Sequence, residues 1–256
     1  MTRTPVVGGT VPGRLVGRSW REAVLASGED AYVDHHLAPA VVREVRAGDG
    51  WWAVRFTPTS YFDQGGLHVG GDVERVSAVV ADLCRALRPH EVTVDERVPL
   101  SFAGPEQGAR WAWLHTARPP APVPGEERVV WSPDPARLQA LLDEANPTAY
   151  VRPGDPSAPA WAAVPDPGGT GRLLACGAVA HHRPGVPLLS SIAVSPSARR
   201  QGLGAALTAA MTRRLLARAP VVSLALWSGN TVARALYDRV GFTGGHDFLT
   251  LELPRP

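Results

Sequence analysis

The stretch IAVSPSARRQGLGA, residues 192–205, decides how the second half of this chain folds. Its glycine-rich turn follows an apolar, strand-like segment, residues 188–194, and precedes an Ala/Leu-rich helical segment that ends near Ala219. A strand, turn and helix in this order present free backbone N–H groups at the helix start, where the helix dipole also favours an anion. Gly202 and Gly204 lack a Cβ, so an anion can approach the main chain closely. The stretch therefore predicts a bound phosphate.

Competing phosphate loops do not fit this spacing. Arg199 and Arg200 add positive charge to the turn, which favours a pyrophosphate over a single carboxylate. A Walker A loop needs Gly-x-x-x-x-Gly-Lys-Ser/Thr, and this chain contains no lysine. A Rossmann fingerprint needs a third glycine where Leu207 stands. Both a mononucleotide P-loop and a dinucleotide fold are therefore disfavoured.

A second motif follows the helix and the next strand-like segment, residues 221–227. It reads GNTVARALYDRVGF, residues 229–242. The two motifs together resemble the GNAT (GCN5-related) N-acetyltransferase family. Its acyl-CoA loop is Gln/Arg-x-x-Gly-x-Gly/Ala after a strand ending in Val-x-Pro, and its later segment is Asn-x-x-Ala-x-x-x-Tyr-x-x-x-Gly-Phe. The resemblance covers about the last half of the chain.

The resemblance implies an α/β fold with a mixed, centrally splayed sheet flanked by helices, the acyl-CoA N-acyltransferase fold. It also implies acetyl-CoA, or another short acyl-CoA, as co-substrate, with no metal. The main chain near Ile192 would donate to the oxyanion, and Tyr237 would be the general acid for the leaving thiolate. Asn230 would cap its helix or bond the pantetheine amide. The cofactor-binding residues implied are, for pantetheine, Ile192, Ala193, Val194 and Asn230, and, for pyrophosphate, Arg199, Arg200, Gln201, Gly202, Leu203, Gly204 and Ala205.

The general base stays unassigned. Residues 188–194 carry no carboxylate, so that strand supplies no direct carboxylate base. His181 and His182 have a suitable intrinsic pKa, and Asp143 or Glu144 could act through a water. Two loops, residues 146–159 and 244–248, are expected to shape the acceptor mouth, and neither has a dominant charge. The acceptor is therefore left as a small-molecule or peptide amine.

A proline-rich link, residues 118–125, divides the chain, because proline interrupts helices and central strands. We expect an N-terminal α/β domain over residues 1–124 and a GNAT N-acetyltransferase domain over residues 125–256. The first half shows a hairpin, a helix over residues 72–87 and a strand, the order of the second half. It is interpreted as a degenerate copy of the same fold, as in tandem acetyltransferases. It carries no Arg-x-x-Gly-x-Gly, so we do not expect it to bind CoA.

General features fit an ordinary enzyme of 256 residues with a formal net charge of +2, too small to argue for nucleic acid. No segment reads as a membrane span or a secretory signal, so a cytoplasmic location is expected. Cys84 and Cys176 are far apart and predict neither a disulfide framework nor a zinc site. A homodimer stays open.

The function predicted is acyl-CoA-dependent N-acyl transfer, with an acetyl group passing from acetyl-CoA to a primary amine by direct attack in a ternary complex. The alternatives are a non-catalytic CoA-binding or regulatory module and a binder of nucleotide phosphates.

Overall fold

The computed structural model describes residues 11–37, 39–57, 65–100, 102, 108–183 and 185–253. The chain forms two compact units. Unit 1 comprises Met1–Arg110 and Asp247–Pro256, and unit 2 comprises Trp111–His246. Among the described helices, none has the length and apolar character needed to cross a bilayer.

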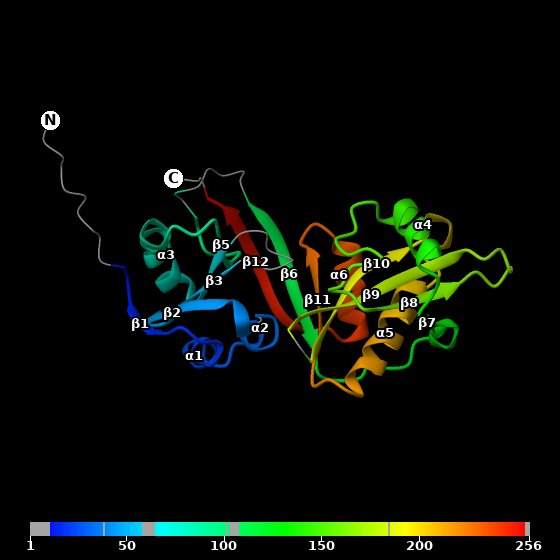
Figure 1. The fold of residues 1–256 in the computed structure, drawn as a ribbon, viewed down its shortest axis with the longest axis horizontal. Helices are drawn as coiled ribbons and strands as arrows, with labels where there is room; N and C mark the ends of the chain where they lie inside the picture. Colours follow the sequence, from blue (N-terminus) through cyan, green and yellow to red (C-terminus); the bar gives the residue numbers. More distant parts are fainter. Residues whose placement is uncertain are drawn as a thin grey trace, which may run out of the picture. The chain divides into compact units, whose positions relative to one another are not determined.

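Unit 1 is a sheet with helices on both faces (Figure 1). Its strands lie in the order β1-β2-β3-β4-β5-β12, and all neighbours are antiparallel except the parallel pair β4 and β5. The elements are β1 (Arg14–Gly17), α1 (Trp20–Ala26), α2 (Ala31–His35), the 3-10 turn η1 (Pro39–Val41), β2 (Val42–Gly48), β3 (Trp51–Phe56), β4 (Gly66–Gly71), α3 (Val73–Leu87), β5 (Glu91–Asp95) and the unit 1 part of β12 (Gly244–Glu252).

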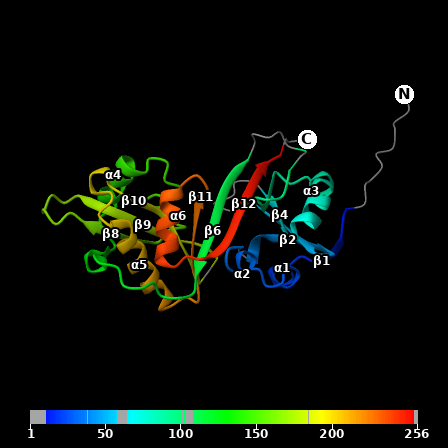
Figure 2. The same cartoon turned by 180° about the vertical axis from the view of Figure 1, so that it is seen from behind.

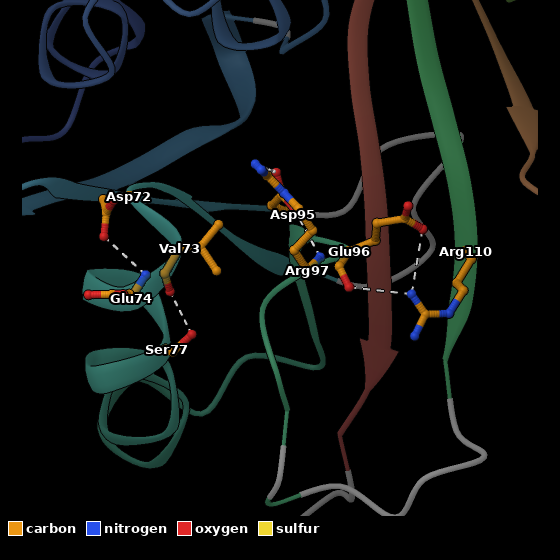
Figure 3. Close-up of polar contacts among 8 residues, drawn as sticks. All are labelled: Asp72, Val73, Glu74, Ser77, Asp95, Glu96, Arg97 and Arg110. Atoms are coloured by element: carbon orange, nitrogen blue, oxygen red, sulfur yellow. Dashed lines mark hydrogen bonds and ion pairs between the residues drawn. The ribbon is translucent and has the colours of Figure 1, made fainter.

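Helix α3 forms where the sequence predicts it, because apolar residues recur at helical spacing. Val76, Val80, Leu83 and Leu87 are buried and pack in one cluster with apolar residues of β3, β4 and β5. Asp72 caps the helix, since its carboxylate accepts from the backbone N–H groups of the first turn (Figure 3).

Unit 2 has the strand order β7-β8-β9-β10-β11-β6, with β10 and β11 parallel and the other neighbours antiparallel. The elements are β6 (Ala109–Thr116), η2 (Glu126–Arg128), β7 (Val130–Trp131), α4 (Pro135–Ala145), β8 (Ala160–Pro165), β9 (Leu173–Arg183), β10 (Val186–Val194), η3 (Pro196–Ala198), α5 (Leu203–Leu216), β11 (Val222–Trp227) and α6 (Thr231–Val240).

Both faces of the unit 2 sheet are covered. Alternate strand residues, such as Ala162 and Val164, cluster with apolar residues of α5 and α6. The intervening residues, such as Trp161 and Ala163, are buried too. Helix α4 packs against β9 and β10, on the face opposite α5 and α6 (Figure 2). The mixed sheet flanked by helices is therefore confirmed.

The two units repeat one order of elements: a strand, a helical segment, three antiparallel strands, a helix and a parallel strand. The strand that follows then pairs in the other unit. Strand β6 follows β5 in the chain but pairs with β11, and β12 follows α6 but pairs with β5. Each sheet is thus completed by the last strand of the other half of the chain.

The proline-rich link lies inside unit 2. Val123 packs against the cluster that includes α5, and Glu126 binds Arg213 of α5 through two contacts of 3.1 and 3.2 Å. The expected boundary between residues 124 and 125 therefore falls within this unit, because β6 precedes the link and already pairs with β11.

Candidate cofactor and acyl-transfer site

The unit 2 sheet opens between β10 and β11. The two strands pair only at Leu188 with Ser223 and at Leu189 with Leu224. Beyond Leu189, the described pairing of β10 is with β9 alone, and its register shifts between Ser190 and Ala193. In the described part of the chain, the edge of β10 that would face β11 therefore has no partner strand over residues 190–194. An extended chain bearing amides can bind such an edge as an added strand does.

The side chains of the expected pantetheine strand are divided between the two faces of the sheet. Ile192 and Val194 face α5, since a Cβ added at Gly177 or at Gly204 would meet them at 3.3 and 3.5 Å. Ala193 is buried on the opposite face. The side chains thus pack on both faces of the sheet, so a ligand beside this strand would contact its main chain.

The α5 N-terminus is open. Gly202 is the N-cap residue at φ 79°, and no side chain caps the helix. A Cβ at Gly202 would have nothing within 4 Å. Arg199, Arg200 and Gln201 are exposed beside it, and Arg200 also adopts a positive φ of 63°. Uncapped N–H groups, a dipole end and two guanidinium groups meet at one exposed turn, which suits a pyrophosphate.

Gly204 has a packing role in addition to the cofactor-binding role expected of it. It lies in the first turn of α5, is buried, and a Cβ there would come within 3.0 Å of Leu236 Cδ1. The small residue therefore lets α5 approach α6 closely. Leu203 is buried as well, so these two positions can contribute to an anion only through their backbone N–H groups.

Asn230 is the N-cap residue of α6, and Tyr237 lies within the helix. The Asn230 Oδ1 accepts a hydrogen bond from the Ala233 N–H at 3.2 Å, so Asn230 caps the helix. Capping was one of the two roles expected of Asn230. Tyr237 is 8% exposed, and its ring contacts Phe242 edge-on with centroids 6.2 Å apart. Burial raises the pKa of Tyr237 to about 12, so the phenol keeps its proton at neutral pH.

Ser191 is a residue that the sequence did not single out. It adopts φ 48° at the register shift of β10, a conformation that non-glycine residues rarely adopt. Its Oγ accepts from the Val151 N–H at 3.1 Å and donates to the Val151 carbonyl at 2.8 Å. The hydroxyl thus fastens the loop between α4 and β8 to the open edge of β10. No sequence signal joins two residues so far apart in the chain.

The proposed sources of a base are held elsewhere. Asp143 pairs with Arg152 at 2.8 Å. Glu144 pairs with Arg172 at 3.0 Å and accepts from the buried Ser195 hydroxyl at 3.2 Å. The Glu144–Ser195 contact joins α4 to the start of the phosphate loop, and the two arginine contacts join α4 to the loops that follow α4 and precede β9.

The histidines lie at the other end of the β9–β10 hairpin. His181 is exposed and follows Ala180, which pairs with Leu188. The sheet opens on the other side of this pair, beyond Leu189, so His181 lies on the side away from the opening. The side chain of His182 lies outside the described residues. The second expected acceptor loop, residues 244–248, is part of β12, and Gly244 lies against the His115 ring.

The comparisons with known proteins agree with this geometry. Residues 170–247 match a family model described as FR47-like protein. A GCN5-related N-acetyltransferase from Kribbella flavida aligns with 94% of this chain and 97% of its own, at 18% identity and a TM-score of 0.51. A GNAT-family acetyltransferase from Colwellia psychrerythraea aligns with 88% of this chain and 94% of its own, at 13% identity and a TM-score of 0.50. No curated protein matches the chain significantly.

The chain therefore has the fold of the GNAT N-acetyltransferases over nearly its whole length. The resemblance of its second half to that family is confirmed by the matched segment, which contains the phosphate loop and both motif residues of α6. Within the described part of the chain, no group of three or more His, Cys, Asp or Glu residues is placed to hold a metal ion.

Proposed function

We propose that this protein is an acyl-CoA-dependent N-acyltransferase that moves an acetyl group from acetyl-CoA to a primary amine. One observation carries the proposal. The unpaired end of β10, where the sheet opens toward β11, is followed directly in the chain by the turn that leads to the uncapped N-terminus of α5. A pyrophosphate at the helix and a pantetheine arm along β10 would use both features at once.

The chemistry assigned to the site is direct transfer. The neutral amine nitrogen forms a bond to the thioester carbon, and the oxyanion accepts hydrogen bonds from a β10 backbone N–H near Ile192. The carbon–sulfur bond then breaks. The nitrogen releases a proton to water, and the leaving sulfur takes one from the Tyr237 hydroxyl. The Tyr237 phenolate then regains a proton from water, which restores the site. Asn230 caps α6 and so fixes the start of the helix that presents this phenol.

A non-catalytic CoA-binding module is the second candidate. The α6 motif argues against it, because binding alone does not require a buried phenol two helical turns beyond the cap. A binder of nucleotide phosphates would use the same loop but would leave the opening of the sheet without a role.

Calorimetric titration of the full chain with acetyl-CoA, ATP and NAD tests the proposal. We expect micromolar binding of acetyl-CoA and none of the other two at that concentration. Thiol release from acetyl-CoA over a panel of amines then separates an enzyme from a binding module. Absence of acetyl-CoA binding would overturn the proposal, and binding without turnover on any amine would favour the module.

A further inference from the structure

The face of β11 that borders the opening is exposed and apolar. Side chains alternate along a strand. Val222, Leu224 and Leu226 point into the cluster with α5 and α6, so Ala225 and Trp227 point to the opposite face. Both are exposed, and 65% of Trp227 is accessible, although Val222 to Leu224 are buried. The exposed residues are those beyond the last pairing with β10.

Trp227 lies on β11 three residues beyond its last pair with β10. If the pairing of Leu189 with Leu224 continued for three more residues, Ile192 would lie opposite Trp227. Strand β10 separates from β11 before that point. On its other side, β11 pairs Trp227 directly with Trp111 of β6, also in unit 2. Directly paired residues share a face, with Cβ atoms about 5 Å apart. The two indoles thus form an aromatic wall, Trp227 and Trp111, next to the open edge of β10.

On the face of its strands that carries the wall, there is no Asp, Glu, Lys or Arg: Arg110, the charged residue of β6 next to Trp111, lies on the other face by strand alternation and pairs with Glu96 at 3.5 Å. Residues 111–116, 186–194 and 222–227 contain no Asp, Glu, Lys or Arg. On this face of the three strands, a carboxylate or a phosphate would find no Lys or Arg, and a polyamine would find no Asp or Glu. An ammonium group, by contrast, is attracted to the face of an indole, and an aromatic ring stacks on it.

We infer that Trp227, supported by Trp111, selects the acceptor, and that the acceptor is a primary amine attached to an aromatic or similarly flat apolar group. This inference rests on the proposed function, because it assigns the acceptor subsite of the same reaction. The ring packs against the wall, and the amine points across the opening toward the thioester carbon.

The test uses three amines with the full chain and acetyl-CoA: 2-phenylethylamine, phenylalanine and spermidine. We expect kcat/KM for 2-phenylethylamine to exceed that for each of the other two by about 10-fold or more. The variant Trp227→Ala is expected to raise KM for 2-phenylethylamine about 10-fold with little change in kcat, and Trp227→Phe to restore most of the loss. Val232→Ala, which removes a side chain that is 81% exposed on the neighbouring helix, is the matched control and should change neither constant.

Two results would overturn the inference while leaving the proposed function intact: preference for spermidine or phenylalanine, or an unchanged KM for 2-phenylethylamine in Trp227→Ala. Failure of acetyl-CoA to bind in calorimetry would instead remove the proposed function, and the acceptor subsite with it. Binding of acetyl-CoA with no turnover of any of the three amines also counts against the aromatic acceptor.

Discussion

Helices α3 and α5 occupy the same place in the two repeated units, after the third antiparallel strand and before the parallel one, but their N-termini differ. The α3 N-terminus is closed by the Asp72 carboxylate, which accepts from the backbone N–H groups of Glu74 and Arg75 at 3.0 and 3.1 Å. The α5 N-terminus begins at Gly202 and has no side-chain cap. In one unit, the N–H groups at the helix start are occupied by a carboxylate of the chain itself, and in the other unit no side chain occupies them.

The difference extends along the rest of each unit. In unit 1, β4 keeps regular pairing with β3 beside its parallel contact with β5. In unit 2, β10 shifts register at Ser191 and leaves β11. Between β5 and β6, the described residues contain no helix where unit 2 has α6. The comparison teaches that two units with one order of elements differ in a helix cap, in the regularity of one strand and in one helix, and these are the features on which the proposed site depends.

The largest effect is expected from giving α5 the cap that α3 has. In Gly202→Asp, a carboxylate would occupy the place proposed for the pyrophosphate. Blocking two or three charge-assisted N–H contacts, each about 1.5 kcal/mol, should weaken acetyl-CoA binding about 1,000-fold. Gly202→Asn is the matched control, because it has the same shape and tolerates the positive φ but carries no charge. Calorimetry measures both, and wild-type affinity in Gly202→Asp would remove the pyrophosphate from this helix end.

Tyr237→Phe tests whether α6 makes unit 2 the reactive unit. The ring and its contact with Phe242 are retained, so the folded structure should not change. Loss of a positioned proton donor should lower kcat about 100-fold, with acetyl-CoA affinity unchanged. Thiol release and calorimetry give the two quantities, with the unfolding temperature as the check on folding. Unaltered kcat would exclude Tyr237 as the acid and leave the cofactor site standing.

Ser191→Ala and Ser191→Gly separate two features of the irregular strand in unit 2. Both variants lose the hydrogen bonds to Val151, whereas glycine alone also relieves the positive φ. If the hydroxyl positions the acceptor loop, KM for the amine should rise about 10-fold in both, and the Val151 amide should exchange faster with solvent. A wild-type KM in Ser191→Gly would show that only the backbone conformation matters.

The parts of this molecule that the sequence predicted are those set by neighbouring residues. Asp72 starts α3, and the glycine-rich turn precedes α5, each at the expected place. Caps and turns depend on a few consecutive side chains, so local reasoning is sufficient for them.

Long-range partners were not predictable in this way. Nothing in β6 or β12 indicates that each pairs in the other unit, since an alternating strand pairs equally well with several neighbours. The Ser191 contact with Val151 and the packing role of Gly204 against Leu236 also depend on tertiary approach. The sequence therefore predicted the motifs of the candidate site. It did not predict the irregular, unpaired edge of β10.

Removing the closed cap of unit 1 should affect stability rather than binding. Asp72→Ala exposes the first N–H groups of α3 and should cost about 1 kcal/mol of unfolding free energy. Asp72→Asn keeps an oxygen acceptor and should cost less. Chemical denaturation measures both, and calorimetry should still find one acetyl-CoA per chain. A second acetyl-CoA bound by Asp72→Ala would show that the carboxylate alone closes an otherwise complete site.

The smallest effect concerns Glu91, which pairs with Gly66 where unit 2 pairs Ser223 with Leu188. Burial, and secondarily the charge of Glu252 on the paired strand, raise the pKa of Glu91 to about 7. The unfolded chain loses this proton near pH 4.5, whereas the folded chain keeps it up to about pH 7, so the unfolding free energy should fall as pH rises across that interval. Because the carboxyl is partly exposed and screened, we expect a fall of only about 1 kcal/mol. Glu91→Gln should abolish this contribution in denaturation curves at pH 5 and pH 8, and a pH dependence equal to that of the wild type would assign it to other groups.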